Sequence, residues 1–241
     1  MSAEPAGLTA LIEHGAKTLG IDLPAEAFAL FETYFELLEN RGQSVNLTAI
    51  SGAEDVARLH FLDSIALLKA LQFKDSSVID IGSGAGFPGV ALKIAEPSIG
   101  LTLLDSTGKR VAFLSELCTA LCINAECIHA RAEDAARTPP SRENFDIAVS
   151  RAVANMNILC ELCLPFVRPG GTFIAMKGVD SAQELAEAHS AIKTLGAELQ
   201  ECLDYHIPGT EIVHRAILIR KIHSTPEKYP RRYAKIANSP L

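Results

Sequence analysis

The chain has 241 residues, 48% of them hydrophobic and 21% charged, which supplies ample apolar material for the core of a globular domain. It contains no run of 18 apolar residues, and its first ten residues lack the basic and apolar regions of a secretory signal, so neither a membrane span nor export is expected. Because a chain of this size needs no disulfides, its six cysteines predict reduced thiols and a cytoplasmic location.

Charge is distributed unevenly along the chain. The net charge is −7, yet residues 220–241 hold six basic residues and one acid, a balance of +5, which leaves −12 on the remainder. Such an asymmetry is typical of a tail that contacts phosphate, and a solvated terminal tail is the alternative.

The first part of the chain, residues 5–75, is predicted to be helical. Its apolar residues recur at helical spacing, as in Phe28, Phe31, Phe35 and Leu38. The second helix is expected to end at Asn40-Arg41-Gly42, and a third to run from Glu54 to Leu71.

From residue 76 onward, strand-like apolar runs alternate with helical segments. The predicted strands are Val78–Ile81, Leu101–Leu104, Glu126–Ala130, Phe145–Ser150, Thr172–Met176, Glu198–His206 and Glu211–Ile222, and the predicted helices are Pro88–Ala95, Lys109–Leu121, Asn155–Leu164 and Ser181–Leu195. This alternation predicts an α/β fold with parallel strands, and a hairpin at Pro208-Gly209 adds one antiparallel edge strand. We expect a helical extension (1–75), a core domain (76–223) and a basic tail (224–241).

Glycine dominates the stretch 82–89, Gly-Ser-Gly-Ala-Gly-Phe-Pro-Gly, which directly follows the first predicted strand. Pro88 suits the first turn of a helix, because its missing N–H would be unpaired there. Glycines let the backbone approach a ligand closely, and a helix N-terminus offers free N–H groups. The stretch therefore predicts a strand, loop and helix that hold a nucleotide-like cofactor.

Two acids flank this glycine loop. From Gly84 the spacing is G-x-G-x-x-G, and Asp105 follows at the offset of a ribose-binding acid, which suits a nicotinamide dinucleotide and S-adenosylmethionine alike. Asp80 favours S-adenosylmethionine, because its carboxylate would neutralise the methionine ammonium but repel a pyrophosphate. The predicted cofactor-binding residues here are Asp80, Gly82, Gly84, Gly86 and Asp105.

Polar residues also follow the third and fourth predicted strands, whose carboxyl ends should face the ligand crevice. Ala132 is small enough to lie beside a flat adenine, and Glu133 or Asp134 could accept a hydrogen bond from its amino group; a helix N-cap is the alternative. Arg151 could hold the cofactor carboxylate or an RNA phosphate, and a surface salt bridge is the alternative.

The remaining motifs point to no further chemistry. Cys160-Glu161-Leu162-Cys163 lies inside a predicted helix without a second pair at zinc spacing, so core packing and no metal site are expected. His60 is either a packing residue or a contact to substrate or cofactor. Neither a Ser-His-Asp order nor a P-loop nor an HExxH motif occurs.

Seven blocks combine into one pattern: Asn46-Leu47-Thr48, His60–Ser64, Asp80–Gly89, Leu104–Arg110, Arg131–Glu133, Ser150–Ala152 and Met176–Gly178. On these blocks the chain resembles, from about residue 30 to residue 240, the bacterial 16S ribosomal RNA guanine-N7 methyltransferases. The tail segment 228–232 matches as well. Two positions depart from the family: Leu59 stands where a basic residue is usual, and residues 233–237 lack the expected glycine and proline.

The resemblance implies a class I methyltransferase, that is, a Rossmann-like, mostly parallel seven-stranded sheet with one antiparallel edge strand, preceded by N-terminal helices. It implies S-adenosylmethionine as cofactor, with Gly82 and Phe87 lining its pocket, Ala132 and Glu133 at the adenosine, and Arg151 at cofactor or substrate. The expected substrate is 16S rRNA or the small ribosomal subunit, and the substrate-binding residues are Arg151, Lys177, Arg231 and Arg232. A monomer that binds no membrane is expected.

The implied reaction needs no general base, because guanine N7 carries a free lone pair at neutral pH; catalysis would come from alignment of N7 with the methyl group, and no catalytic residue is assigned. Two alternatives stay open on the sequence: a nicotinamide-dependent oxidoreductase, and a non-catalytic RNA-binding module on a methyltransferase scaffold.

Overall fold

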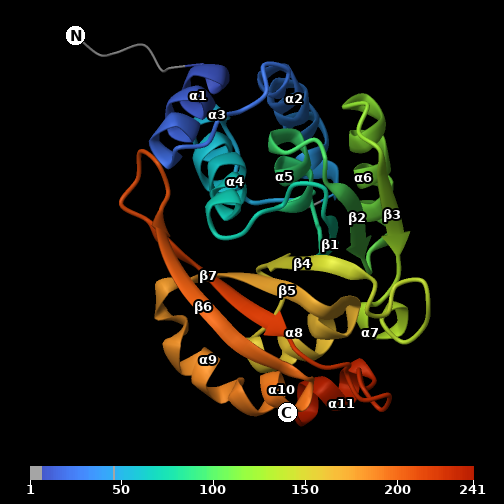
Figure 1. The fold of residues 1–241 in the computed structure, drawn as a ribbon. Helices are drawn as coiled ribbons and strands as arrows, with labels where there is room; N and C mark the ends of the chain where they lie inside the picture. The colour runs from blue at the N-terminus through green and yellow to red at the C-terminus, as the bar shows by residue number, and fades with distance from the viewer. Residues whose placement is uncertain (1–6, 46) are drawn as a thin grey trace.

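A computed structural model describes residues 7–45 and 47–241 of the chain (Figure 1). Residues 1–6 of the expected helical extension, and Asn46 of the first motif, lie outside the described residues. Within the described part, no helix combines the length and the apolar character needed to cross a membrane.

Seven strands form one sheet in the order β3-β2-β1-β4-β5-β7-β6. They are β1 (Ser77–Ile81), β2 (Gly100–Asp105), β3 (Ala125–His129), β4 (Phe145–Arg151), β5 (Val167–Gly178), β6 (Ala197–His206) and β7 (Val213–Lys221). Neighbours among β1 to β5 pair in parallel, whereas β7 is antiparallel to both β5 and β6. The predicted fold class is confirmed, and the antiparallel strand β7 lies between β5 and the edge strand β6.

Helices cover both faces of this sheet (Figure 1). One face carries α1 (Leu8–Leu19), α2 (Ala27–Val45), α3 (Ala53–Val56), α4 (Asp63–Ile65), α5 (Gly89–Ala95) and α6 (Gly108–Ala120), and the other carries α7 (Ala132–Ala135), α8 (Met156–Cys163), α9 (Ala182–Glu187), α10 (His189–Thr194) and α11 (Tyr233–Asn238). A π-helical turn, Ala57–Leu62, joins α3 to α4. Short 3-10 turns span Ala66–Lys69, Leu164–Phe166 and Val179–Ser181.

Each face of the sheet has its own apolar core. On the first face, Phe31 of α2 and Phe61 of the π-helical turn lie 4.8 Å apart between ring centroids and pack with Leu103 and Leu114. The second core gathers around Phe166 and the helices α8 and α10. The N-terminal helices share this core with α5, α6 and two residues of the glycine loop, Ala85 and Phe87.

Three predicted helices differ from the structure. Helix α2 continues past Gly42 to Val45, since a glycine costs only about 1 kcal/mol within a helix that tertiary packing holds. The third predicted helix is a run of α, π and 3-10 turns, and the fourth helix of the core domain breaks at Ala188 into α9 and α10. Strand β5 also begins at Val167, before the expected Thr172.

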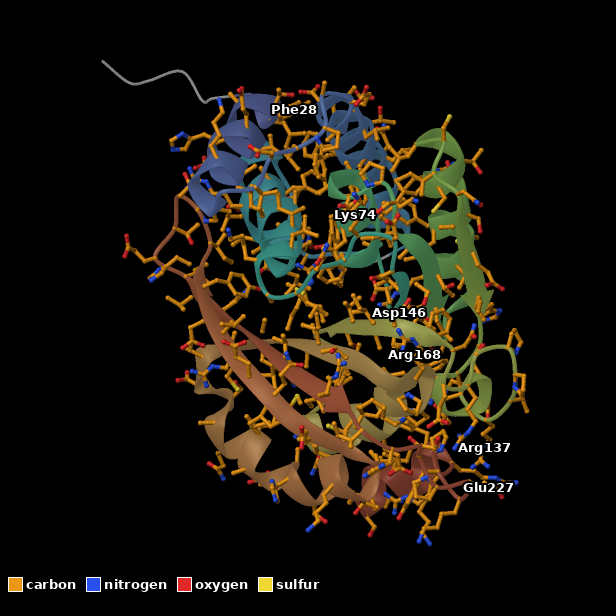
Figure 2. The ribbon with its side chains drawn as sticks, viewed as in Figure 1. Phe28, Lys74, Arg137, Asp146, Arg168 and Glu227 are labelled. Atoms are coloured by element: carbon orange, nitrogen blue, oxygen red, sulfur yellow. The ribbon has the colours of Figure 1, made fainter. Side chains whose placement is uncertain are left out.

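The two ends of the sheet differ in character. Figure 2 shows Asp146 and Arg168 side by side at the starts of β4 and β5, where Arg168 Nη2 lies 2.6 Å from Asp146 Oδ1. Ser77 Oγ donates to the other carboxylate oxygen at 2.7 Å. These charges pair with one another at the amino ends of the strands.

Candidate active site

The glycine loop between β1 and α5 is tied to the end of β2. Gly82 N–H donates to the Leu104 carbonyl at 2.8 Å, and Gly84 N–H donates to the Asp105 carboxylate at 3.0 Å. Gly82 has a φ of +75°, and a Cβ there would lie 2.6 Å from a methyl of Val153, so only glycine keeps this wall open. Asp105, the predicted ribose ligand, therefore also positions the loop.

Asp80 lies fully buried beneath the same loop. Gly89 N–H, at the start of α5, donates to its Oδ2 at 2.8 Å, and among the described residues its Oδ1 has no hydrogen-bond partner. A Cβ on Gly89 would lie 2.8 Å from that Oδ2, so the last glycine of the motif allows helix and carboxylate to approach. Burial raises the pKa of Asp80 to about 7.

An aromatic stack that was not predicted from the sequence supports the loop from the N-terminal helices. Tyr34 of α2 donates its buried hydroxyl to the Ala85 carbonyl at 2.7 Å, and its ring stacks on Phe87 at 5.0 Å. His60 stacks on Phe87 at 4.4 Å. Tyr34 follows the helical spacing of the apolar stripe in α2, but only the tertiary structure shows that it contacts the loop.

Three neighbouring cavities follow the carboxyl ends of the strands. Cavity A, about 280 Å3, is lined by Ile81, Gly82, Leu104, Asp105, Ser106, Arg110, Ala130, Arg131, Ala132, Glu133, Ala152, Val153, Leu162 and Tyr233. Cavity B, about 170 Å3, is lined by Leu47, Thr48, His60, Gly82, Ser83, Gly84, Ala85, Phe87, Arg110, Arg151 and Ala152. Cavity C, about 510 Å3, is lined by Ile50, Leu59, His60, Asp63, Arg151, Ala152, Met176, Lys177, Gly178, Ile212 and His214.

The cavities adjoin through shared residues. Gly82 belongs to cavities A and B, and His60 and Arg151 belong to B and C. Ala152 lines all three, with a φ of +56° that a residue with a Cβ rarely adopts. Backbone strain of this kind concentrates at functional sites, and here it lies where the three cavities meet.

Arg151 joins the end of β4 to the π-helical turn. Its guanidinium donates to the Leu59 carbonyl at 3.0 Å, to Asp63 Oδ2 at 3.1 Å and to His60 Nδ1 at 3.0 Å. The buried Asp63 also accepts from His214 at 2.8 Å, and this hydrogen bond raises the pKa of His214. The positive charge of Arg151 is thus compensated within the site.

His60 is uncharged at neutral pH. Burial and the adjacent Arg151 charge lower its pKa to about 4. Its Nδ1 lies 3.0 Å from the guanidinium of Arg151 and 3.1 Å from the Leu59 carbonyl, and its Nε2 lies 2.8 Å from the Thr48 hydroxyl. The neutral ring fixes the relative positions of the Thr48 segment, Arg151 and Phe87.

The predicted substrate-binding cations differ in their surroundings. Lys177 lines cavity C, and its ammonium donates to the Ala154 carbonyl at 2.7 Å and to Glu184 at 2.6 Å. Arg231 forms a bidentate pair with the fully buried Glu161, with a shortest N–O distance of 2.6 Å. An RNA phosphate would have to displace Glu161 from Arg231, whereas Arg232 is exposed.

The structure brings most predicted site residues together. Cavity A gathers Gly82, Asp105, Ala132 and Glu133; cavity B gathers Gly82, Gly84, Phe87 and Arg151; cavity C adds Lys177. Asp80, Gly86, Arg231 and Arg232 line none of the three. Four further residues of the site were not predicted from the sequence: Tyr34, Asp63, His214 and Tyr233. Of these, only Asp63 stands in a motif block.

The CxxC cysteines pack in the second core. Cys160 and Cys163 are both fully buried, and burial raises the pKa of both thiols. Across the described ranges, no three histidine, cysteine or acidic side chains group into a set that could hold a metal ion.

Comparisons with known proteins give a consistent result. A family model, GidB, described as rRNA small subunit methyltransferase G, matches residues 27–213. The chain is 44% identical over 233 residues to a ribosomal RNA small subunit methyltransferase G of Clostridium beijerinckii, covering 96% of this chain and 98% of that one. Its identity to the protein of the same name in Pelotomaculum thermopropionicum is 44% over 236 residues, covering 97% and 99%.

Solved structures share the fold at much lower identity. A SAM dependent methyltransferase of Aquifex aeolicus superposes with a TM-score of 0.51 at 16% identity, over 68% of this chain and 92% of that one. A branched-chain polyamine synthase of Thermus thermophilus gives 0.58 at 14% identity, over 85% and 66%.

Proposed function

The chain belongs to the rRNA small subunit methyltransferase G family, and on that premise we propose that it transfers a methyl group from S-adenosylmethionine to N7 of a guanine in 16S ribosomal RNA. Membership confirms the resemblance and the predicted enzyme class, an S-adenosylmethionine-dependent rRNA methyltransferase. It decides against the oxidoreductase alternative, and the experiment below tests the non-catalytic one.

The observation that carries the proposal is the run of donors and acceptors along cavities A and B. Cavity A offers the carboxylates of Asp105 and Glu133 to hydroxyl and amino groups, and Ala132 leaves room for a flat ring. Cavity B continues along the backbone of the glycine loop to Phe87 and Arg151. These groups suit the adenosine of the cofactor in A and its methionine part in B.

When bound, S-adenosylmethionine supplies an electrophilic methyl group on a positively charged sulfur. The residues around the junction with cavity C would orient that methyl toward the acceptor and exclude water. His60 is neutral and Arg151 is paired with Asp63, so neither opposes the positive charge that guanine gains. Since N7 carries a free lone pair, the site requires no general base.

The test is methyl transfer from labelled S-adenosylmethionine to small ribosomal subunits from a strain that lacks this protein. Glu133 and Asp134 make a matched pair, because Glu133 is buried at cavity A whereas its neighbour is exposed and lines none of the three cavities. Wild type and Asp134→Ala should yield labelled 7-methylguanine at equal rates. Glu133→Ala should weaken cofactor binding about tenfold, since it loses one hydrogen-bond acceptor for the cofactor.

Two outcomes would refute the proposal. Wild type that binds the cofactor but labels no ribosomal RNA would favour the non-catalytic alternative. Label recovered as a methylated base other than 7-methylguanine would refute the acceptor atom while it left the enzyme class intact.

A further inference from the structure

Cavity C is the largest of the three cavities and is built by segments far apart in the sequence. Its walls come from the π-helical turn, from the ends of β4 and β5, and from the hairpin that joins β6 to β7. The guanidinium of Arg58 donates to the Gly209 carbonyl, which ties the hairpin to the π-helical turn. Figure 1 shows the hairpin reaching up beside the N-terminal helices.

The walls of cavity C are mainly apolar. Leu59, Met176 and Ile212 contribute side chains, and Ile50 lies on the segment that precedes α3. Ile212 is 41% exposed and lines the same cavity. Apolar walls suit the faces of a nucleobase and do not suit a phosphate, which needs several donors.

The polar groups of cavity C leave hydrogen-bonding capacity for the edge of a base. Lys177 uses two of its three ammonium hydrogens on Ala154 and Glu184, so one can donate into the cavity. His214 bonds Asp63 through Nδ1, so its Nε2 can bond a ligand. One edge of guanine carries an acceptor at O6, which can bond the ammonium of Lys177, and donors at N1 and N2.

We propose that cavity C holds the guanine that receives the methyl group, with its O6 edge at Lys177 and its N7 at the junction with cavity B formed by His60, Arg151 and Ala152. This inference rests on the proposed function. The N7 lone pair forms the new N–C bond as the methyl–sulfur bond breaks with its electrons returning to sulfur, and the positive charge passes from sulfur to the base. Because a base within a helix cannot enter a walled cavity, the guanine must leave its stack.

Gly178 allows the cavity to be filled without disturbing the fold. It is exposed at the end of β5, its φ of −71° suits any residue, and a Cβ there would meet no atom within 4 Å. Because Gly178 lines cavity C, Gly178→Phe should add an aromatic ring to the wall of that cavity. Val179→Phe is the matched control, because Val179 is 37% exposed and does not line the cavity.

Gly178→Phe should lower kcat/KM for ribosomal subunits about 100-fold or more, since the acceptor loses its position, while the affinity for S-adenosylhomocysteine stays at the wild-type value. Val179→Phe should match wild type in both measurements. Full transfer activity in a folded Gly178→Phe would overturn the inference.

A second measurement uses the wild-type protein and needs no substitution. The chain has three methionines, of which Met176 lines cavity C and Met156 is buried in the second core. With 13C-methyl methionine and saturating S-adenosylhomocysteine, guanosine 5′-monophosphate should shift the Met176 methyl signal and leave the Met156 signal in place. Adenosine 5′-monophosphate should have a smaller effect, since it has an amino group where guanine has O6.

The outcomes separate this inference from the proposed function. Wild type that methylates 16S rRNA while Met176 is unmoved, or moves equally with both nucleotides, would overturn cavity C as the guanine site and leave the function intact. Wild type that methylates no RNA would refute the function, whatever the nucleotides do to Met176.

Discussion

The pair between Arg231 and Glu161 gives the basic tail a structural role that can be measured. Glu161 is fully buried and accepts hydrogen bonds from the backbone N–H of Arg231, from its Nη2, and from its Nε–H, which is shared between the two carboxylate oxygens. Replacing Arg231 with alanine removes the guanidinium bonds and the charge that compensates the carboxylate. We expect the variant to lose stability, because it leaves a charged group buried with a single hydrogen bond.

The size of the effect follows from these hydrogen bonds. Removing one partner of a buried ion pair costs about 3–5 kcal/mol. Because the backbone N–H of residue 231 still donates to Glu161, the expected decrease in the free energy of unfolding is near the lower end, about 3 kcal/mol. Domains typically have a total stability of about 5–15 kcal/mol, so the loss should be plain in an unfolding curve.

Urea unfolding followed by circular dichroism measures the loss as a lower midpoint at constant slope. Arg232→Ala is the matched control: its side chain is exposed, so stability should change by no more than about 0.5 kcal/mol. If Arg232 contacts phosphate, this control should also reduce the salt dependence of rRNA binding by about one contact. A destabilisation below about 1 kcal/mol for Arg231→Ala, with reduced salt dependence, would show that its guanidinium binds RNA and refute the structural role.

Three further substitutions test the site itself. Burial raises the pKa of Asp80 from 3.8 to about 7, so the unliganded wild type should lose stability as pH rises from about 4 to 7, by at most on the order of 4 kcal/mol. Asp80→Asn should lose less stability over the same range. An equal change in the free energy of unfolding between pH 5 and pH 8 for wild type and variant, measured by urea unfolding, would contradict this. Gly86→Ala, at a φ of +102° with its Cβ 2.5 Å from the Tyr34 hydroxyl, should weaken cofactor binding about tenfold or more by calorimetry, and unchanged affinity would show that the loop adapts. Arg151→Lys keeps the charge but loses the planar guanidinium that bonds Asp63 and its neighbours, so single-turnover methyl transfer should slow about tenfold. An unchanged rate would show that the charge alone suffices.

Local patterns predicted the order of elements and much of cavity A. The loop at Gly82, the acid Asp105 and the pair Ala132-Glu133 each follow a strand directly, and the carboxyl ends of parallel strands meet at one edge of a sheet. The error at the end of α2 arose because a single glycine, Gly42, lowers helix stability by only about 1 kcal/mol and does not end a helix by itself.

Other features have no local signature. Nothing near Tyr34 indicates that its hydroxyl bonds the glycine loop, and nothing near His214 indicates that it shares Asp63 with Arg151. The tail arginine Arg231 resembles a phosphate ligand in sequence, since a basic run at a terminus looks the same whether it pairs with RNA or with a buried acid.

The α/β class, the family and the cofactor loop could be predicted from the sequence, because they depend on periodicity and on residues adjacent along the chain. Which charges are compensated, and where cavity C lies, depend on contacts between segments that are far apart along the chain. Cavity C forms where the π-helical turn meets the β6–β7 hairpin, and the contact between these segments depends on packing across the whole fold.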